Sequence, residues 1–235
     1  MKNNRISSII KAAVLLLAFA GFTATEAQAQ FSVGVETNSR YVWRGFDFGN
    51  SQSIMPSASY TAGGLEVGLW GADATTGDPA GTEIDIYASY GVETDAGNFA
   101  LSLTDYTFPT AGVDFFDGEE HFIELGVHYD TAINDMAGWF LSGNIFVAND
   151  DDDSIYIETG FDFALEGADL SLFSGFTPGE SGQYGTTEFS FINVGAGVSK
   201  GIELESGREI GVSTSFITNP QAKTAYLVFG LGFGF

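Results

Sequence analysis

Few side chains in this 235-residue sequence could act as a base at neutral pH. The candidates are His121 and His128, because imidazole changes charge near pH 7. A hydrolase needs such a base beside a nucleophile and an orienting group. No Ser, His and Asn arrangement surrounds His128, and His121 has Asp117 and Glu119 as its acidic neighbours in the chain. We expect no enzyme activity. A hydrolase with its site around His121 is the least favoured functional hypothesis for this sequence.

A block of acids is the strongest candidate for metal binding. Asp150 to Asp153 are consecutive, and Ca²⁺ prefers several oxygen ligands. The block lacks the spaced ligands and the glycine of an EF-hand loop. We favour a solvated loop, with Ca²⁺ binding left open, and predict no cofactor.

The charge balance narrows the range of partners. The chain has 8 Lys+Arg against 31 Asp+Glu, a formal net charge of −23. Binding to nucleic acid needs clustered basic residues. Because acids greatly outnumber bases here, we predict that the protein does not bind nucleic acid. Cations, small solutes or plain solvation fit such a surface better.

The first 29 residues have the order of a secretory signal peptide. Basic Lys2, Arg5 and Lys11 precede an apolar run over 12–22. Ala27 and Ala29 fit a cleavage site after residue 29. The run is too short for a membrane span, although an uncleaved helix is the alternative. We therefore predict a signal peptide over 1–29 and one mature domain over 30–235.

The remaining chain alternates apolar with small or polar residues, the pattern of strands with two different faces. Compact turns and longer acidic loops alternate between these strands, as in bacterial outer-membrane barrels, which have an even number of strands. The twelve predicted strands are 31–42, 52–61, 64–73, 82–94, 98–107, 120–131, 137–148, 154–165, 168–176, 186–199, 207–217 and 223–235.

The last predicted strand separates a membrane barrel from a soluble β-sandwich. Its apolar face comprises Phe235, Phe233, Leu231 and Phe229, opposite a face rich in glycine. A terminal aromatic with alternating apolar residues resembles the C-terminal assembly signal of outer-membrane barrels, which implies the barrel-assembly machinery as a partner. We predict an all-β, antiparallel up-and-down barrel in the outer membrane of a Gram-negative bacterium, in contact with lipid and lipopolysaccharide.

Strand parity in such a barrel places Tyr41 and Trp43 toward lipid, and Arg40 and Arg44 toward the lumen. The predicted inner-face residues, several of them near the outer end, are Glu36, Arg40, Arg44, Glu66, Trp70, Glu83, Asp85, Glu120, Glu124 and Glu158.

Two interpretations of these charges remain open. Arg40 and Arg44 could form a constriction with Glu83 and Asp85, whose transverse field filters charged solutes. Alternatively, the arginines neutralise the two acids inside a filled barrel, because buried charges need partners.

Residues 39–45, with the sequence Ser-Arg-Tyr-Val-Trp-Arg-Gly, resemble the Tyr-x-x-Arg-Gly element of the TorF porin family. Residues 56–60, 68–71 and 83–90 resemble further elements of that family in the same order. The glutamine that usually follows the proline is absent after Pro56, so no role is carried over for it. The resemblance implies an outer-membrane barrel and suggests a pore.

Together these patterns predict a porin-like channel for passive diffusion of small hydrophilic solutes or ions, with a preference for cations. Trp70, Phe122, Phe140 and Phe146 are expected to narrow it. The alternative is a non-conducting structural or adhesive barrel with acidic, ion-binding loops. The oligomeric state stays open.

Overall fold

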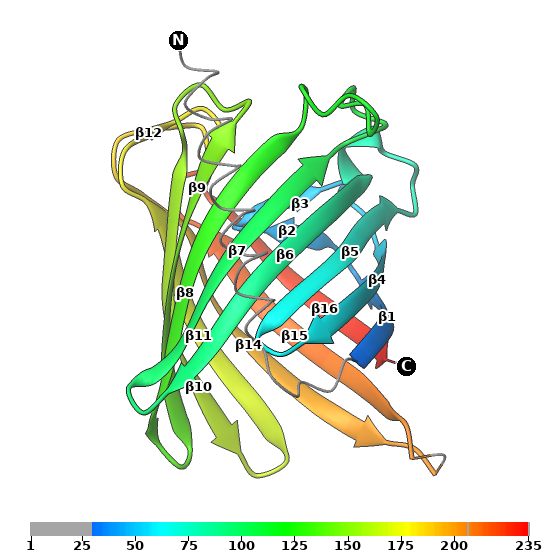
Figure 1. Ribbon diagram of the computed structural model, residues 1–235, viewed down its shortest axis with the longest axis vertical. Helices are drawn as coiled ribbons and strands as arrows, with labels where there is room; N and C mark the ends of the chain where they lie inside the picture. Colours follow the sequence, from blue (N-terminus) through cyan, green and yellow to red (C-terminus); the bar gives the residue numbers. More distant parts are fainter. Residues whose placement is uncertain (1–29, 206, 235) are drawn as a thin grey trace.

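The computed structural model describes residues 30–205 and 207–234 and shows a closed antiparallel β-barrel (Figure 1). The predicted signal peptide lies outside the described residues. In chain order the barrel strands are β1 (Gln30–Asn38), β4 (Ser53–Ala62), β5 (Leu65–Ala74), β6 (Glu83–Thr94), β7 (Gly97–Thr107), β8 (Phe122–Asn134), β9 (Ala137–Ala148), β10 (Ile155–Leu165), β11 (Ala168–Thr177), β14 (Ser190–Glu203), β15 (Glu209–Asn219) and β16 (Thr224–Gly234).

Two short hairpins and one helical turn lie outside this sheet. They are β2 (Tyr41–Trp43) with β3 (Phe46–Phe48), β12 (Glu180–Ser181) with β13 (Thr186–Thr187), and the 3-10 helix η1 (Pro79–Gly81). No helix among the described residues is long and apolar enough to cross a membrane.

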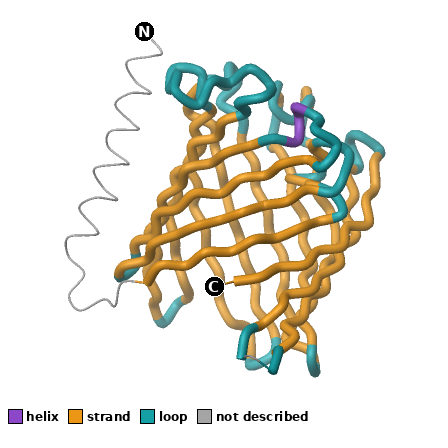
Figure 2. Tube along the Cα trace, turned by 90° about the vertical axis from the view of Figure 1, so that its right-hand side faces the viewer, coloured by secondary structure: helices purple, strands orange, loops and turns teal. Residues whose placement is uncertain are grey.

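Each barrel strand pairs with its neighbours in the sequence, and β1 closes the barrel against β16. Figure 2 shows that the longer connections gather at one end, here called the loop end, and the tight turns at the other, the turn end. The twelve-stranded prediction is confirmed, with most strand bounds within two residues of those expected.

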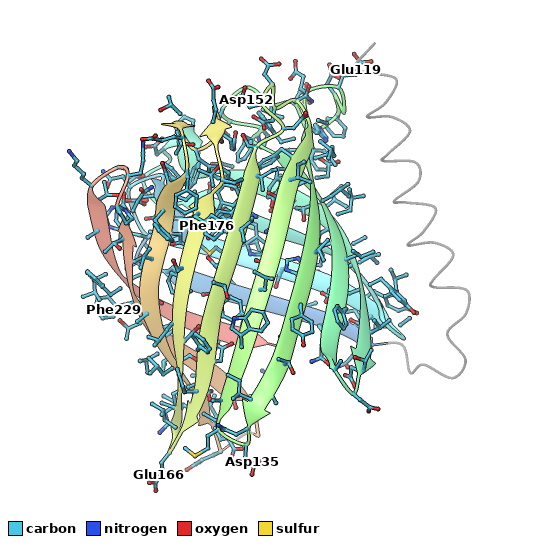
Figure 3. All side chains as sticks on the ribbon, turned by 90° about the vertical axis from the view of Figure 1, so that its left-hand side faces the viewer. Glu119, Asp135, Asp152, Glu166, Phe176 and Phe229 are labelled. Carbon is cyan, nitrogen blue, oxygen red and sulfur yellow. The ribbon has the colours of Figure 1, made fainter. Side chains whose placement is uncertain are left out.

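The two faces of the wall differ as the alternation predicts. Along β16, Leu227, Phe229 and Leu231 are exposed by 56%, 56% and 45% on the outer surface. Figure 3 shows Phe229 projecting away from the barrel. Val228, on the opposite face, is buried. The apolar side chains therefore point outward, which a barrel surrounded by hydrocarbon requires.

Candidate functional site

The lumen at the loop end is filled by the inward hairpin, defined here as strands β2 and β3 with their turn. After Asn38 the chain leaves the wall, and Trp43 pairs with Phe46 across a two-residue turn. The turn residues Arg44 and Gly45 have φ of 49° and 82°, the left-handed values of a tight hairpin turn. The tip crosses the lumen to β14, because a Cβ on Gly45 would lie 1.9 Å from the Ile192 carbonyl oxygen.

Arg44 anchors this tip. Its Nη1 and Nη2 donate to the two carboxylate oxygens of Glu124 at 2.5 and 2.9 Å, and Nη1 also donates to the Tyr184 hydroxyl at 2.6 Å. The guanidinium carbon lies 4.4 Å from the ring centre of Trp43 and 4.3 Å from that of Tyr156. A buried charge with a bidentate partner and two aromatic faces is a strong anchor.

A second contact holds the other end of the hairpin. The Tyr41 hydroxyl donates to Glu83 at 2.8 Å, and Tyr106 donates to Glu124 at 3.0 Å. Glu83 and Asp85 are buried on β6, and Asp85 Oδ1 has no hydrogen-bond partner among the described residues. Glu83 and Glu124 therefore both bind the hairpin directly.

These contacts correct one expectation about the hairpin. Tyr41 is 7% exposed, and Trp43 packs against the Tyr106 and Tyr184 rings at 6.0 and 6.2 Å. The prediction that Tyr41 and Trp43 face lipid is wrong for this structure, because the chain turns inward before reaching them.

The alternative interpretation, in which the arginines neutralise Glu83 and Asp85, is not what the structure shows. Arg40, just before the hairpin, bonds to Asp47 of β3 and to Asn50 just after it, while Arg44 reaches Glu124. Arg40 therefore braces the base of the hairpin and Arg44 attaches its tip to the wall.

Three more of the predicted inner residues lie on the wall without bonding to Arg44, although Glu158 bonds to Tyr156, whose ring contacts Arg44. Glu36 accepts from Asn38 at 3.0 Å, and Glu66 accepts from Tyr87 at 2.7 Å. Glu158 accepts from Asn193 at 2.8 Å and from Tyr156.

Of the last two predicted inner-face residues, Trp70 lies inside the barrel and Glu120 does not. Trp70 lies against the hairpin, its ring centre 5.5 Å from that of Tyr41. Glu120 precedes β8 and is exposed in a loop, so its expected place on the inner wall is wrong. The expected strand began two residues too early, and the chain before Phe122 belongs to the loop.

Tyr184 was not selected from the sequence. It lies between β12 and β13 and is 1% exposed, because the loop over 178–189 folds against the inward hairpin. Burial raises the pKa of the Tyr184 hydroxyl above its ordinary value, so the group stays protonated beside Arg44. An aromatic residue within a polar loop was the signal available.

The cavities become larger toward the turn end. Near the loop end, a space of about 30 Å³ lies among Trp43, Tyr106 and Phe146. Beneath the hairpin, a chamber of about 470 Å³ is lined by residues including Arg44 and Glu158. The lumen is thus blocked at one end by the hairpin and aromatic side chains.

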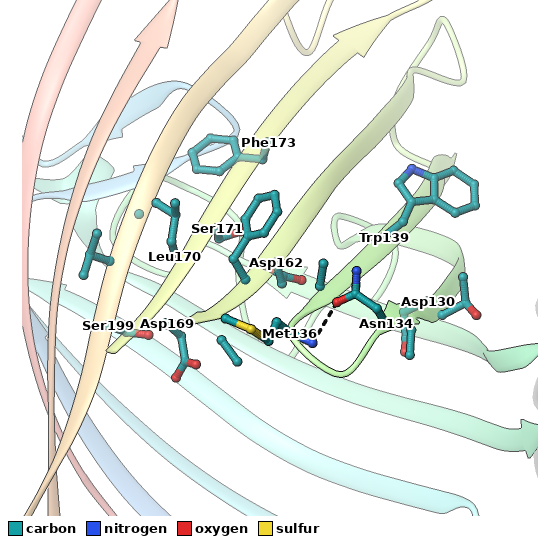
Figure 4. A pocket seen from close by; sticks show the side chains of 18 of the residues that line it. Asp130, Asn134, Met136, Trp139, Asp162, Asp169, Leu170, Ser171, Phe173 and Ser199 are labelled. Carbon is teal, nitrogen blue, oxygen red and sulfur yellow. Dashed lines mark hydrogen bonds between the residues drawn. The ribbon is translucent and has the colours of Figure 1, made fainter. Parts of the chain in front are cut away.

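A vestibule of about 820 Å³ opens at the turn end, and Asp130 lines both it and the chamber. Asp162 and Asp169 project into it from β10 and β11, together with Ser171 and Ser199 (Figure 4). Asp135 also lines it, and apolar side chains such as Leu170 and Phe173 lie beside these polar groups.

The histidines show no catalytic arrangement. His121 Nδ1 lies 2.8 Å from Asp105 and its Nε2 3.0 Å from the Asp114 carbonyl oxygen, whereas Asp117 and Glu119 do not contact it. His128 Nε2 lies 3.0 Å from the Ser102 hydroxyl within the lumen. Among the described residues, His128 has a hydroxyl beside it but no bonded carboxylate, and His121 has a carboxylate but no bonded hydroxyl, whereas a hydrolase triad needs both on one histidine.

The aspartate block serves the local structure. Asp150 accepts from the Ser154 amide, and Asp152 accepts from the Gly182 amide at 2.8 Å. Within the described part of the chain, no cluster of three or more His, Cys, Asp or Glu residues is arranged to hold a metal ion.

The barrel is similar in fold to one solved porin, and a second solved porin matches it less well. The KdgM porin superposes with a TM-score of 0.54 at 8% identity, covering 87% of this chain and 98% of the porin. A triple mutant of the Rh. blastica porin gives a TM-score of 0.39 at 16% identity, covering 78% of this chain and 55% of that one. The chain thus spans about half the length of the second porin, and the first similarity supports the fold alone.

No curated protein matches the sequence. The family described as "Bacterial protein of unknown function (Gcw_chp)" matches residues 23–230, which is most of the chain. The protein therefore belongs to the Gcw_chp family.

Proposed function

We propose that this protein is an outer-membrane channel through which small hydrophilic solutes or ions diffuse, with a preference for cations. The observation that carries the proposal is the acidic vestibule inside a barrel whose outer wall is apolar. Hydrocarbon outside and water inside is the arrangement of membrane barrels with conducting lumens. The resemblance to TorF porins agrees with this interpretation.

The cation preference rests on the vestibule's carboxylates. Asp130, Asp162 and Asp169 line it, and no lysine or arginine is among its lining residues. Arg44, at the tip of the hairpin, is already paired with Glu124. A lumen with uncompensated carboxylates attracts cations and repels anions.

The same proposal assigns location and assembly. The loop end faces the cell exterior, where its acidic loops meet lipopolysaccharide, and the exposed apolar face of β16 is presented to the assembly machinery and then to lipid. The constriction consists of Arg44 and Glu124 with the aromatic residues around them.

A non-conducting structural barrel is the second candidate, because the hairpin leaves a cavity of only about 30 Å³ at the loop end. Planar-bilayer recording separates the two functions. Purified protein under a KCl gradient should give discrete current steps that reverse toward the potassium equilibrium potential. A silent bilayer, with insertion shown by protease protection in matched vesicles, would exclude the channel.

A further inference from the structure

The barrel wall has a gap beside β16 at the loop end. β15 pairs with β16 from Thr224 to Phe233, whereas β1 pairs with it only over Gly230–Gly234. One more bond follows, from the Ser39 amide to the Phe229 carbonyl oxygen at 2.8 Å. Among the described residues, 224–228 have no strand on the β1 side. Unpaired strand edges are costly in a membrane, so this edge needs a partner.

The segment that leaves the wall has the sequence of the missing strand. Phe31 and Val33 of β1 point outward, being 66% and 40% exposed, and continued alternation would place Tyr41 and Trp43 on that same face. Continuing the β1–β16 register, in which Asn38 lies opposite Gly230, would place Tyr41 opposite Leu227 and Trp43 opposite Ala225. The two arginines of the segment would then face the lumen.

We propose that residues 39–44 occupy two alternative positions, and that exchange between them opens and closes the channel. In the closed position, the one in this structure, the hairpin fills the lumen. In the open position, the same residues extend β1 along the free edge of β16 and complete the wall. This inference rests on the proposed channel function and assigns its regulation.

The exchange replaces one set of interactions with another of similar kind. Opening breaks the bonds of Arg44 to Glu124 and of Tyr41 to Glu83. It forms backbone bonds to β16, moves the aromatic rings to the membrane interface that such rings favour, and leaves Arg44 in a hydrated lumen. If the hairpin position and the wall position of residues 39–44 are close in free energy, the protein populates both, and the exchange between them acts as a gate.

The chain has a hinge at each end of the moving segment. Ser39 is already bonded to Phe229, so extension along β16 starts from a formed pair. At the other end, Gly49 and Asn50 have φ of 80° and 44°, and backbone in this region can change direction sharply.

A disulfide between Val42→Cys and Tyr226→Cys tests the open position. The two residues would face each other in the extended register, one pair beyond Tyr41 and Leu227. Because Ser39 and Phe229 are already hydrogen-bonded, Tyr41 and Leu227 would form the next hydrogen-bonded pair, and Val42 and Tyr226 a non-hydrogen-bonded one. Such non-hydrogen-bonded pairs bring side chains close together. In the closed structure Val42 instead lines the chamber with His128 and Phe140. The native chain has no cysteine, so the pair is unambiguous.

In lipid vesicles, diamide should cross-link the double variant, as shown by a gel shift and by mass spectrometry of the joined peptides. The control pair Val42→Cys with Gly232→Cys is six residues out of register and should not cross-link. The locked variant should conduct severalfold more than its reduced form, and dithiothreitol should reverse the gain.

The outcomes separate this inference from the proposed function. Absence of the cross-link, or a cross-linked protein whose conductance does not rise above a conducting reduced form, overturns the gate and leaves the channel standing. A cross-link with silent bilayers in both forms supports the strand exchange as a structural change but removes the channel, and with it the gating role.

Discussion

Arg44 and Glu124, eighty residues apart in the sequence, form a two-bond ion pair inside the barrel, with N to O distances of 2.5 and 2.9 Å. The arginine belongs to the tip of the inward hairpin and the glutamate to the wall strand β8. Their side chains are 11% and 5% exposed, so water screens the pair little. This contact joins the hairpin to the barrel.

Replacing Glu124 with Gln should release the hairpin. Removing one partner of a buried pair leaves the other charge without compensation, at a cost of about 3–5 kcal/mol. Bilayer conductance should rise, and trypsin should cleave after Arg44 in intact protein. Glu119→Gln, in an exposed loop, is the matched control and should resist cleavage like the wild type. Equal resistance of both variants would contradict the anchor.

Replacing Gly45 with Ala should weaken the hairpin through a collision. A Cβ there would lie 1.9 Å from the Ile192 carbonyl oxygen. Gly77→Ala is a matched control, because φ is 72° at that residue but no atom lies within 4 Å of the added Cβ. Both variants share the backbone strain, of order 1–3 kcal/mol, and only Gly45→Ala should also increase conductance. Similar currents in the two variants would show that the tip does not press against β14.

Adjacent residues of β16 test which face meets lipid. Leu231 is 45% exposed on the outer face, whereas a Cβ on Gly232 would have no atom within 4 Å on the opposite face. Leu231→Arg should destabilise the folded barrel in vesicles by up to about 2–4 kcal/mol, the cost that a basic side chain on the lipid face reaches at mid-membrane. Gly232→Arg should cost much less, because it points into a hydrated lumen. Urea unfolding in vesicles measures both, and the reverse order would refute the orientation of the wall.

Removing three of the four carboxylates that line the vestibule should reduce the channel's preference for cations. The triple variant Asp130→Asn, Asp162→Asn and Asp169→Asn removes three carboxylates that line the vestibule. Its reversal potential under a KCl gradient should move toward zero, because the lumen then discriminates less by charge. A triple control at exposed acids, Asp95→Asn, Glu119→Gln and Glu188→Gln, should keep the wild-type value. A shift of equal size in both variants would argue that surface charge alone sets the preference.

The alternation of residue types predicted most of the wall. The last strand illustrates why, because Leu227, Phe229 and Leu231 repeat every second residue and a strand exposes alternate residues on one face. The same alternation placed Glu83 and Asp85 together on one face of β6, and both are buried against the lumen. The even number of strands and the division into turns and loops followed from the breaks between segments.

The destination of residues 39–48 was decided by the tertiary structure. Alternation shows that a segment has two different faces, but not whether those faces meet lipid, water or another part of the protein. Tyr41 and Trp43 satisfy the pattern of a wall strand and equally that of a hairpin packed on Tyr106 and Tyr184. The choice depends on Glu124 and Tyr184, which are distant in sequence and become neighbours only when the barrel closes. The alternation of residue types along the chain therefore determined the barrel wall. Contacts between residues distant in sequence determined that residues 39–48 fill the lumen.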